Sequence, residues 1–151
     1  TIWLDEGLIG DHTDGHVDNL ARFIAPGKVV CMRPFGDDDP NAKILSDIEA
    51  TLREATDASG RKLEVITLPS PGRIEIDGEP VAASHMNFYI ANHSVVVPVY
   101  GVLSGDTAPG IEAVEVLKSA MDRPHFIAVD SSHILTGGGS FHCISQQQPT
   151  V

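Results

Sequence analysis

The chain repeats one pattern after 66 residues: Phe23-Ile24-Ala25-Pro26-Gly27-Lys28-Val29-Val30 returns as Tyr89-Ile90-Ala91-Asn92-His93-Ser94-Val95-Val96. Each copy is an apolar run, a pair of turn-forming residues and a second apolar run. β-Branched residues beside such a turn are typical of a β-hairpin. We therefore expect two hairpins, which reverse at Pro26-Gly27 and at Asn92-His93.

A helix is expected after each hairpin, because apolar residues recur there at helical spacing. These residues are Ile44, Leu45, Ile48, Leu52 and Ala55 in the first copy, and Ile111, Val114, Leu117 and Met121 in the second. Residues 37–40 supply an N-cap and a proline suited to the first helical turn. Further strands are expected at 63–68 and 126–129. The pattern predicts an α/β protein with ββαβ modules at approximately 20–68 and 87–130.

A further module is expected to begin at 141–151, where Phe141-His142-Cys143-Ile144 has the pattern of a strand. The opening residues Thr1-Ile2-Trp3-Leu4 also have the pattern of a buried strand. Repeated modules cover one another's faces, and two and a fraction of them would leave open edges. We therefore expect the chain to be part of a longer protein. Residues 73–81, which contain Asp77-Gly78, are expected to form a small excursion hairpin or a surface loop.

Length and composition predict one soluble globular domain. The 151 residues are 42% hydrophobic and 21% charged, as in ordinary folded proteins. The formal net charge of −11 argues against nucleic-acid binding, because no basic patch is available to neutralise phosphates. No apolar run approaches the ~20 residues of a membrane span. Two cysteines do not make a disulfide framework, which favours a reduced, cytoplasmic protein. We therefore expect neither a nucleic-acid partner nor a membrane partner.

The first polar cluster is Asp11-His12-Thr13-Asp14-Gly15-His16-Val17-Asp18-Asn19. In an extended strand His12, Asp14, His16 and Asp18 would share one face, where they could bind a divalent metal or form an acid–base centre. Gly15 interrupts such a strand, which weakens the metal interpretation but leaves His16 and Asp18 paired. A solvated acidic loop is the alternative without a function.

The second polar cluster is Gly137-Gly138-Gly139-Ser140-Phe141-His142-Cys143-Ile144. The glycines let the backbone approach a ligand closely, and Cys143 follows them. A cysteine attacks as the thiolate, so a neighbouring cation or imidazole must lower its pKa. His142 alternates with Cys143 and is expected to point away from the site. The alternative for Cys143 is a small buried residue, which is our interpretation of Cys31 within its apolar strand.

Together the two clusters indicate a cysteine nucleophile with a His-x-Asp pair far upstream. Three stretches then identify the chain as similar to a known family: Gly15-His16-Val17-Asp18-Asn19, Asn87-Phe88-Tyr89-Ile90-Ala91-Asn92, and Gly137-Gly138-Gly139 through His142-Cys143-Ile144-Ser145-Gln146-Gln147-Gln148-Pro149. In this order they resemble the agmatine deiminases of the peptidyl-arginine deiminase, or pentein, superfamily, over essentially the whole chain.

The resemblance implies a five-bladed α/β propeller built of ββαβ modules. Residues 1–151 would form the C-terminal two-fifths or so of a single catalytic domain. The implied reaction is hydrolysis of agmatine to N-carbamoylputrescine and ammonia, a step of putrescine biosynthesis, with no metal or organic cofactor. The implied substrate is therefore a small cationic guanidine.

The resemblance also implies residue roles. Cys143 matches the nucleophile, His16 the general acid–base, and Asp18 a carboxylate that grips the guanidinium, while Gly139 is expected beside the substrate. The family's other guanidinium-binding carboxylates would lie upstream of Thr1. Association with that N-terminal portion, or a homo-oligomer, is therefore expected.

Other functions remain open from the sequence. A deiminase of peptidyl or free arginine would use the same chemistry. A metal-binding hydrolase would use His12, Asp14, His16 and Asp18 and would not need Cys143. A catalytically silent fragment would fold only on association with a partner. For Asn87, a hydrogen bond within its loop is the simplest interpretation, and a substrate contact is the alternative.

Overall fold

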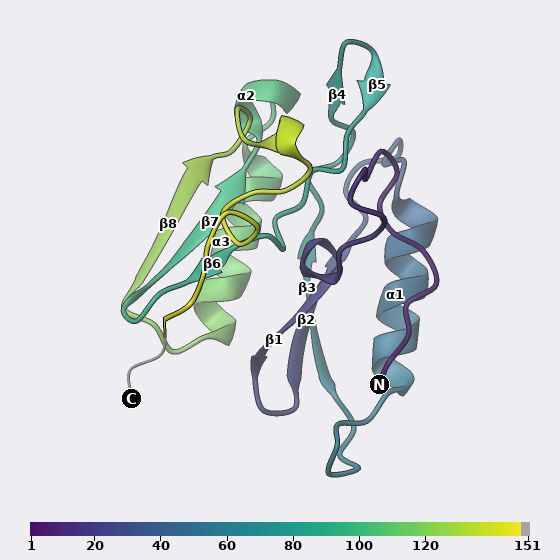
Figure 1. The fold of residues 1–151 in the computed structure, drawn as a ribbon, viewed down its shortest axis with the longest axis vertical. Coiled ribbons are helices and arrows are strands. Elements are labelled where there is room, and N and C mark those ends of the chain that lie inside the picture. The colour runs from purple at the N-terminus through teal and green to yellow at the C-terminus, as the bar shows by residue number, and fades with distance from the viewer. Residues whose placement is uncertain (149–151) are drawn as a thin grey trace.

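The computed structural model describes residues 1–148, which form two ββαβ units (Figure 1). The first unit consists of β1 (Ala21–Ala25), β2 (Lys28–Arg33), α1 (Ala42–Glu54) and β3 (Glu64–Pro69). The second consists of β6 (Tyr89–Ile90), β7 (Ser94–Val99), α3 (Ala108–Ala120) and β8 (His125–Asp130). The expected α/β class, built from repeated ββαβ units, is confirmed.

The remaining elements are short. The helices η1 (Val17–Asn19), α2 (Gly101–Ser104) and η2 (Leu135–Gly137) lie outside the predicted pattern. The strands β4 (Glu75–Ile76) and β5 (Glu79–Pro80) pair antiparallel and form the expected excursion hairpin. Its turn residues Asp77 and Gly78 have φ of 54° and 82°, a conformation that an Asp-Gly pair favours.

Both three-stranded sheets have the same topology. In each, the first strand pairs antiparallel with the second, and the second pairs parallel with the third. Ala25 pairs with Lys28 and Ile90 with Val95, so both hairpins reverse where the sequence repeat predicts. A parallel pair requires a long crossover connection, which α1 and α3 supply.

The helix α1 buries four of the five predicted apolar positions: Ile44, Leu45, Ile48 and Leu52. It begins at Ala42 rather than at Pro40, because the Asp39 carboxylate accepts the backbone N–H of Asn41 at 2.8 Å and forms a turn before the helix.

The helix α3 buries Leu117 but not Ile111, whose side chain is 62% exposed. It contacts its own strands β7 and β8 and also β3 of the first unit. One hydrophobic core therefore runs through both units.

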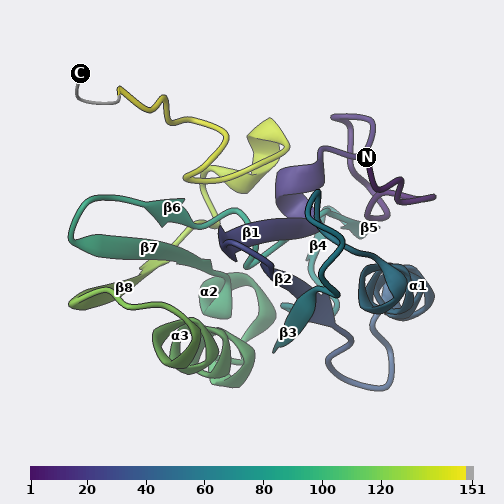
Figure 2. The same cartoon turned by 90° about the horizontal axis from the view of Figure 1, so that it is seen from below.

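The helices and the long loops lie on opposite sides of the strands. In Figure 2, α1 and α3 are seen end-on beside the sheets, whereas the chain before β1 and the chain after β8 gather on the other side. Those two segments carry the polar clusters found in the sequence. Among the described residues, no helix has both the length and the apolar character needed to cross a bilayer.

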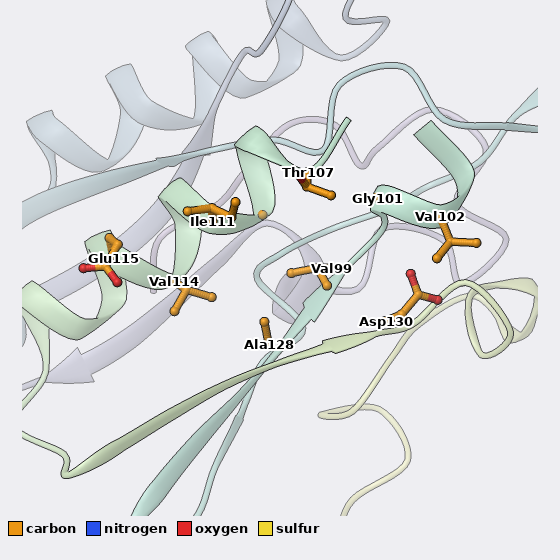
Figure 3. Close-up of a pocket in the computed structure, with 10 residues that line it drawn as sticks. Val99, Gly101, Val102, Thr107, Ile111, Val114, Glu115, Ala128 and Asp130 are labelled. Carbon is orange, nitrogen blue, oxygen red and sulfur yellow. The ribbon is translucent and has the colours of Figure 1, made fainter. Parts of the chain in front are cut away.

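An apolar groove lies between α3 and β8 (Figure 3). Its walls are formed mainly by Val99, Val102, Ile111, Val114 and Ala128, with Asp130 and Glu115 among the other lining residues. None of these residues belongs to the polar clusters. The groove is therefore a feature of the outer sheet face rather than part of the candidate site.

Two sequence expectations are wrong. Thr1–Leu4 form no strand, and the Trp3 side chain is 82% exposed. Residues 141–144 form a turn rather than a strand, closed by hydrogen bonds from Ile144 N–H to the Ser140 carbonyl and from Ser145 N–H to the His142 carbonyl. The strand expected at the start of the further module is therefore absent from residues 141–148, and 149–151 lie outside the described residues.

His85 is buried against the second unit, beside Pro98 and Tyr100, and is 1% exposed. Its Nδ1 lies 2.7 Å from the carbonyl oxygen of Pro98, which can only accept, so Nδ1 carries the proton. No hydrogen-bond partner among residues 1–148 reaches Nε2. Burial lowers the pKa of His85 to about 4, and the ring is neutral at physiological pH.

We predict that Leu117→Ala lowers the free energy of unfolding by about 2–5 kcal/mol, because it opens a cavity where α3 joins both sheets. Ile111→Ala, on the same helix but exposed, is the matched control and should change it by no more than about 0.5 kcal/mol. Urea denaturation measures both. Equal losses in the two variants would contradict the packing described for α3.

A pH dependence follows from His85. Its pKa in the folded state is below the ordinary 6.5, so the unfolded chain binds the extra proton first, and stability falls as the pH drops from about 6.5 towards about 4. His85→Gln, which cannot titrate, should lose less stability over that range. Urea denaturation of both proteins at several pH values measures the difference, and parallel pH profiles would refute the assignment.

Candidate active site

The short helix η1 positions His16 and Asp18 directly before β1. The Asn19 N–H donates to the His16 carbonyl at 3.1 Å, and the buried Asn19 side chain anchors the turn. Gly15 precedes it with φ of 83° and lies against Gly7. His16 and Asp18 are thus brought to one side by a helical turn. The extended-strand geometry used to pair them in the sequence is wrong, although the pairing itself is confirmed.

Cys143 lies in the turn that follows the triple glycine. Ser140 anchors this loop, because its buried hydroxyl lies 2.5 Å from the hydroxyl of Ser131 and hydrogen-bonds to it. Gly139 packs directly under the cysteine: a Cβ added at this position would lie 2.5 Å from Cys143 Sγ. Position 139 therefore has no room for a side chain while Cys143 stays in place.

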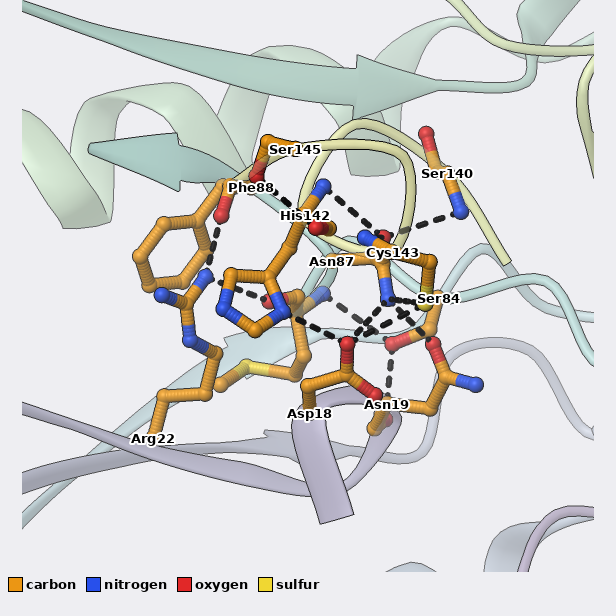
Figure 4. A network of polar contacts seen from close by, with 11 residues as sticks. Asp18, Asn19, Arg22, Ser84, Asn87, Phe88, Ser140, His142, Cys143 and Ser145 are labelled. Carbon is orange, nitrogen blue, oxygen red and sulfur yellow. Dashed lines mark hydrogen bonds and ion pairs between the residues drawn. The ribbon is translucent and has the colours of Figure 1, made fainter. Parts of the chain in front are cut away.

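His16, Asp18 and Cys143 come together, with one ligand-type atom of each within 4.8 Å of the others. The Cys143 thiol donates to Asp18 Oδ2 at 3.1 Å (Figure 4). The turn also brings His142 to the site, where its Nδ1 donates to the same oxygen at 2.6 Å. The expectation that His142 points away is wrong, because residues 141–144 do not form a strand and side chains do not alternate there.

Asn87 connects these groups from the segment that leads into β6. Its Nδ2 lies 3.0 Å from Cys143 Sγ, 3.1 Å from Asp18 Oδ2 and 2.9 Å from Asn19 Oδ1. Its Oδ1 accepts the backbone N–H groups of Ser140, His142 and Cys143 at 2.9–3.1 Å. The expected hydrogen bonding within its own loop is therefore only a small part of what Asn87 does.

Charge and burial shift the pKa values of Asp18 and Cys143 in opposite directions. Burial raises the pKa of Asp18, but hydrogen bonds from His142 and Cys143 and the charges of the His142 and His16 imidazoles outweigh it and hold the pKa below its usual value. Burial raises the pKa of Cys143, and the Asp18 carboxylate raises it further, against a lowering by Asn87. Cys143 is therefore a thiol beside an ionised carboxylate at neutral pH.

Arg22 on β1 supplies the nearest fixed cation. Its guanidinium lies 4.4 Å above the centre of the Phe88 ring and donates to the carbonyl oxygens of Phe88 and Met86. Burial lowers its pKa, while the negative charges of Asp18 and Cys143 raise it. Arg22 thus ties β1 to the residues on either side of Asn87.

The four-residue metal site considered from the sequence does not form. Among residues 1–148, His16 and Asp18 group with Cys143, and neither His12 nor Asp14 joins them. Asp14 is exposed in a turn with φ of 59°, and the His12 ring lies beside Gly138. The donor set that remains, a thiol, an imidazole and a carboxylate, suits nucleophilic catalysis with a general acid–base.

Sequence reasoning assigned no role in the site to Asn19, Arg22 and His142, and it gave Asn87 a place there only as an alternative. One signal was available for Asn87. At the 66-residue offset it takes the place of Ala21, and a polar residue at a buried repeat position usually has a specific partner. No local pattern marks the other three, because their partners lie more than 60 residues away in the chain.

Known proteins resemble this chain over almost its whole length. A family model described as Porphyromonas-type peptidyl-arginine deiminase matches residues 1–149. A Legionella pneumophila protein provisionally assigned as an agmatine deiminase is 41% identical over 148 residues, which are 98% of this chain and 41% of that protein.

Two solved structures have the same fold. The agmatine deiminase of Enterococcus faecalis superposes with a TM-score of 0.85 at 32% identity, over 98% of this chain and 44% of that one. A provisionally assigned arginine deiminase from Porphyromonas gingivalis gives 0.84 at 28% identity, over 95% and 41%. The expected fold class, part of an α/β propeller, is confirmed.

The chain spans about two fifths of the length of these relatives. Within that span the match leaves almost no residue out, and the resemblance seen in the three sequence stretches is confirmed. The chain belongs to the Porphyromonas-type peptidyl-arginine deiminase family.

Proposed function

We propose that this chain carries the nucleophile, the acid–base and one substrate carboxylate of an agmatine deiminase. The observation that carries the proposal is the meeting of Cys143, His16 and Asp18 within 4.8 Å, drawn from the two ends of the chain. The named relatives include an agmatine deiminase at 32% identity, which supports the same substrate.

Substrate binding follows from charge. A guanidinium is a planar cation, and a carboxylate binds its N–H groups with strong, directional hydrogen bonds. Asp18 is ionised and faces Cys143, so a guanidinium held by Asp18 would bring its central carbon towards the sulfur. Gly139 leaves the Cys143 sulfur uncovered by a side chain, which supports its place beside the substrate.

In the first chemical step Cys143 gives its thiol proton to His16, and the resulting thiolate adds to the guanidinium carbon and forms a C–S bond. The tetrahedral adduct then breaks one C–N bond as His16 donates a proton to the departing nitrogen, which leaves as ammonia. A covalent S-alkylthiouronium remains on Cys143.

In the second step His16, now neutral, takes a proton from water. The resulting hydroxide attacks the same carbon, the C–S bond breaks, and the Cys143 thiolate is restored, while the hydroxyl proton leaves to the solvent as the carbonyl forms. The products are N-carbamoylputrescine and ammonia, and the net reaction consumes one water. No metal or organic cofactor is required for these steps.

The biological setting is part of the same proposal. N-Carbamoylputrescine formation belongs to putrescine biosynthesis, and the substrate is a small cytosolic cation, which fits a cytoplasmic protein. The acidic net charge of −11 favours a cationic ligand. Further carboxylates would come from an N-terminal portion or a second copy that completes the site.

A deiminase of peptidyl or free arginine is the second candidate, because the family model and the P. gingivalis structure carry that name. The chemistry at Cys143 would be identical. The two candidates differ in the groups that recognise the rest of the substrate, so the substrate range of the full-length protein separates them.

We predict that the full-length protein releases ammonia and N-carbamoylputrescine from agmatine in metal-free buffer. Cys143→Ser should reduce the rate by about a thousandfold or more, because the hydroxyl is a far weaker nucleophile at this pH. Product analysis by mass spectrometry and an ammonia assay measure both proteins.

Cys31→Ser is the control, because Cys31 is buried in β2 and burial raises its pKa to about 12. It should retain activity if it folds. Arginine and an arginine-containing peptide are assayed in parallel. Turnover that survives Cys143→Ser would exclude the proposed mechanism, and turnover of arginine alone would favour the second candidate.

We predict that Asp18→Asn lowers kcat/KM for agmatine by about 10- to 100-fold, because a charge-assisted hydrogen bond to the guanidinium is lost. Asp14→Asn is the matched control: it removes the same charge from an exposed position four residues earlier. Steady-state kinetics on both variants test this. Equal effects would show that Asp18 acts only through general charge.

A further inference from the structure

The side chain of Asn87 holds an unusual position in the site. It is 1% exposed, and both ends of its amide are used. Three backbone N–H groups, from Ser140, His142 and Cys143, point at one end. Backbone N–H groups can only donate, so that end must be the carbonyl oxygen, and the NH₂ group must face the sulfur.

We propose that Asn87 is a further catalytic residue, whose NH₂ group donates to the sulfur of Cys143 and stabilises it as the thiolate. The proposal rests on Cys143 being the nucleophile. It adds a group that touches the reacting atom and that is separate from the acid–base His16 and the substrate carboxylate Asp18.

The geometry explains why an amide is needed there. Cys143 Sγ lies 3.1 Å from Asp18 Oδ2, so ionisation of the thiol places two negative charges side by side. Asn87 Nδ2 lies 3.0 Å from the sulfur and 3.1 Å from that oxygen. Its two N–H groups face three acceptors, of which the third is the neutral Asn19 Oδ1 at 2.9 Å. A thiolate attracts an N–H group more strongly than a thiol or an amide oxygen does, so the contact with the sulfur strengthens on ionisation, whereas the S–H bond to Asp18 is lost.

The other charged groups facing the sulfur do not replace this contact. His16 and Asp18 approach from η1, His142 from the cysteine loop and Arg22 from β1. Asp18 and His142 are bound to each other, and the Arg22 guanidinium is engaged with the carbonyls of Met86 and Phe88. Among the described residues, Asn87 is the side chain that donates an N–H group to the sulfur, and the backbone N–H of Ser140 assists it to a smaller extent.

Arg22 holds Asn87 in place. Its guanidinium binds the main-chain carbonyls immediately before and after Asn87 and stacks on Phe88. The carbonyl end of the Asn87 amide meanwhile accepts three N–H groups of the cysteine loop. The amide is therefore fixed at both ends, and no rotation is needed to meet the thiolate when it forms.

The test is the rate of alkylation of Cys143 by iodoacetamide as a function of pH, followed by mass spectrometry of its peptide in the full-length protein. Asn87→Asp keeps the oxygen that accepts the three N–H groups and replaces the donor with a carboxylate. We expect the pH midpoint for Cys143 to rise by about one unit or more, so that alkylation near neutral pH slows about tenfold.

Asn92→Asp is the matched control, because it makes the same charge change in the exposed turn between β6 and β7. Its midpoint should equal that of the unaltered protein. Thermal melting verifies that each variant is folded. An unchanged midpoint in folded Asn87→Asp would overturn the proposal, as would an equal shift in both variants.

A second measurement needs no change at Asn87, in case that variant does not fold. In the unaltered protein the NMR signals of the Asn87 NH₂ group should shift with pH at the midpoint of Cys143 alkylation, and in Cys143→Ala this shift should vanish. An NH₂ signal that is indifferent to Cys143 ionisation would overturn the proposal.

Neither readout uses agmatine, so the inference and the proposed function can fail separately. If the pH midpoint of Cys143 alkylation depends on Asn87 but the protein hydrolyses no guanidine, the Asn87 proposal stands and the deiminase proposal fails. If the protein hydrolyses agmatine but the pH midpoint of Cys143 alkylation does not depend on Asn87, the deiminase proposal stands and the Asn87 proposal fails.

Discussion

The packing of α3 against two sheets at once is the contact on which the rest of the structure depends. One side of α3 covers β7 and β8, and another side covers β3 of the first unit. Arg33 at the end of β2 reinforces the contact through an ion pair with Glu112 at 2.5 Å, although such a partly exposed pair contributes little by itself. Because this packing fixes the two units relative to each other, it sets β1 beside the segment before β6. Arg22, Asn87 and η1 meet at that boundary.

The two units share a topology but differ in what covers them. The pairs Val30–Ile66 and Val96–Ile127 occupy the same register in their sheets, as do Met32–Leu68 and Pro98–Val129. Leu68 is fully buried under α3, whereas Val129 is 38% exposed. The face of β8 that carries Ile127 and Val129, which are 47% and 38% exposed, is therefore the counterpart of the surface that α3 occupies on β3. The apolar groove lies on the other face of β8, which carries Ala128 and Asp130.

Local sequence patterns predicted the elements well and the site only in part. Hairpins, amphipathic helices and the Asp-Gly turn depend on residues near in sequence, and these expectations agree with the structure. His142 was misplaced because strand alternation was assumed for residues that form a turn. That turn is held by Asn87, more than 50 residues earlier, and no periodicity could reveal such a partner. His16 and Asp18 lie together as predicted, but a helical turn brings them together and not the extended strand that was assumed.

The charges of the site set a condition on its ligand. Asp18 accepts hydrogen bonds from both His142 and the Cys143 thiol, and its negative charge opposes ionisation of that thiol. An anionic or neutral ligand would leave this opposition in place. A guanidinium bound to Asp18 would neutralise the carboxylate and place a positive charge beside the sulfur, and both effects favour the thiolate. The same carboxylate would then keep Cys143 protonated when the site is empty and allow the thiolate to form only when a cation is bound. This arrangement suits a nucleophile whose sulfur is otherwise exposed to solvent.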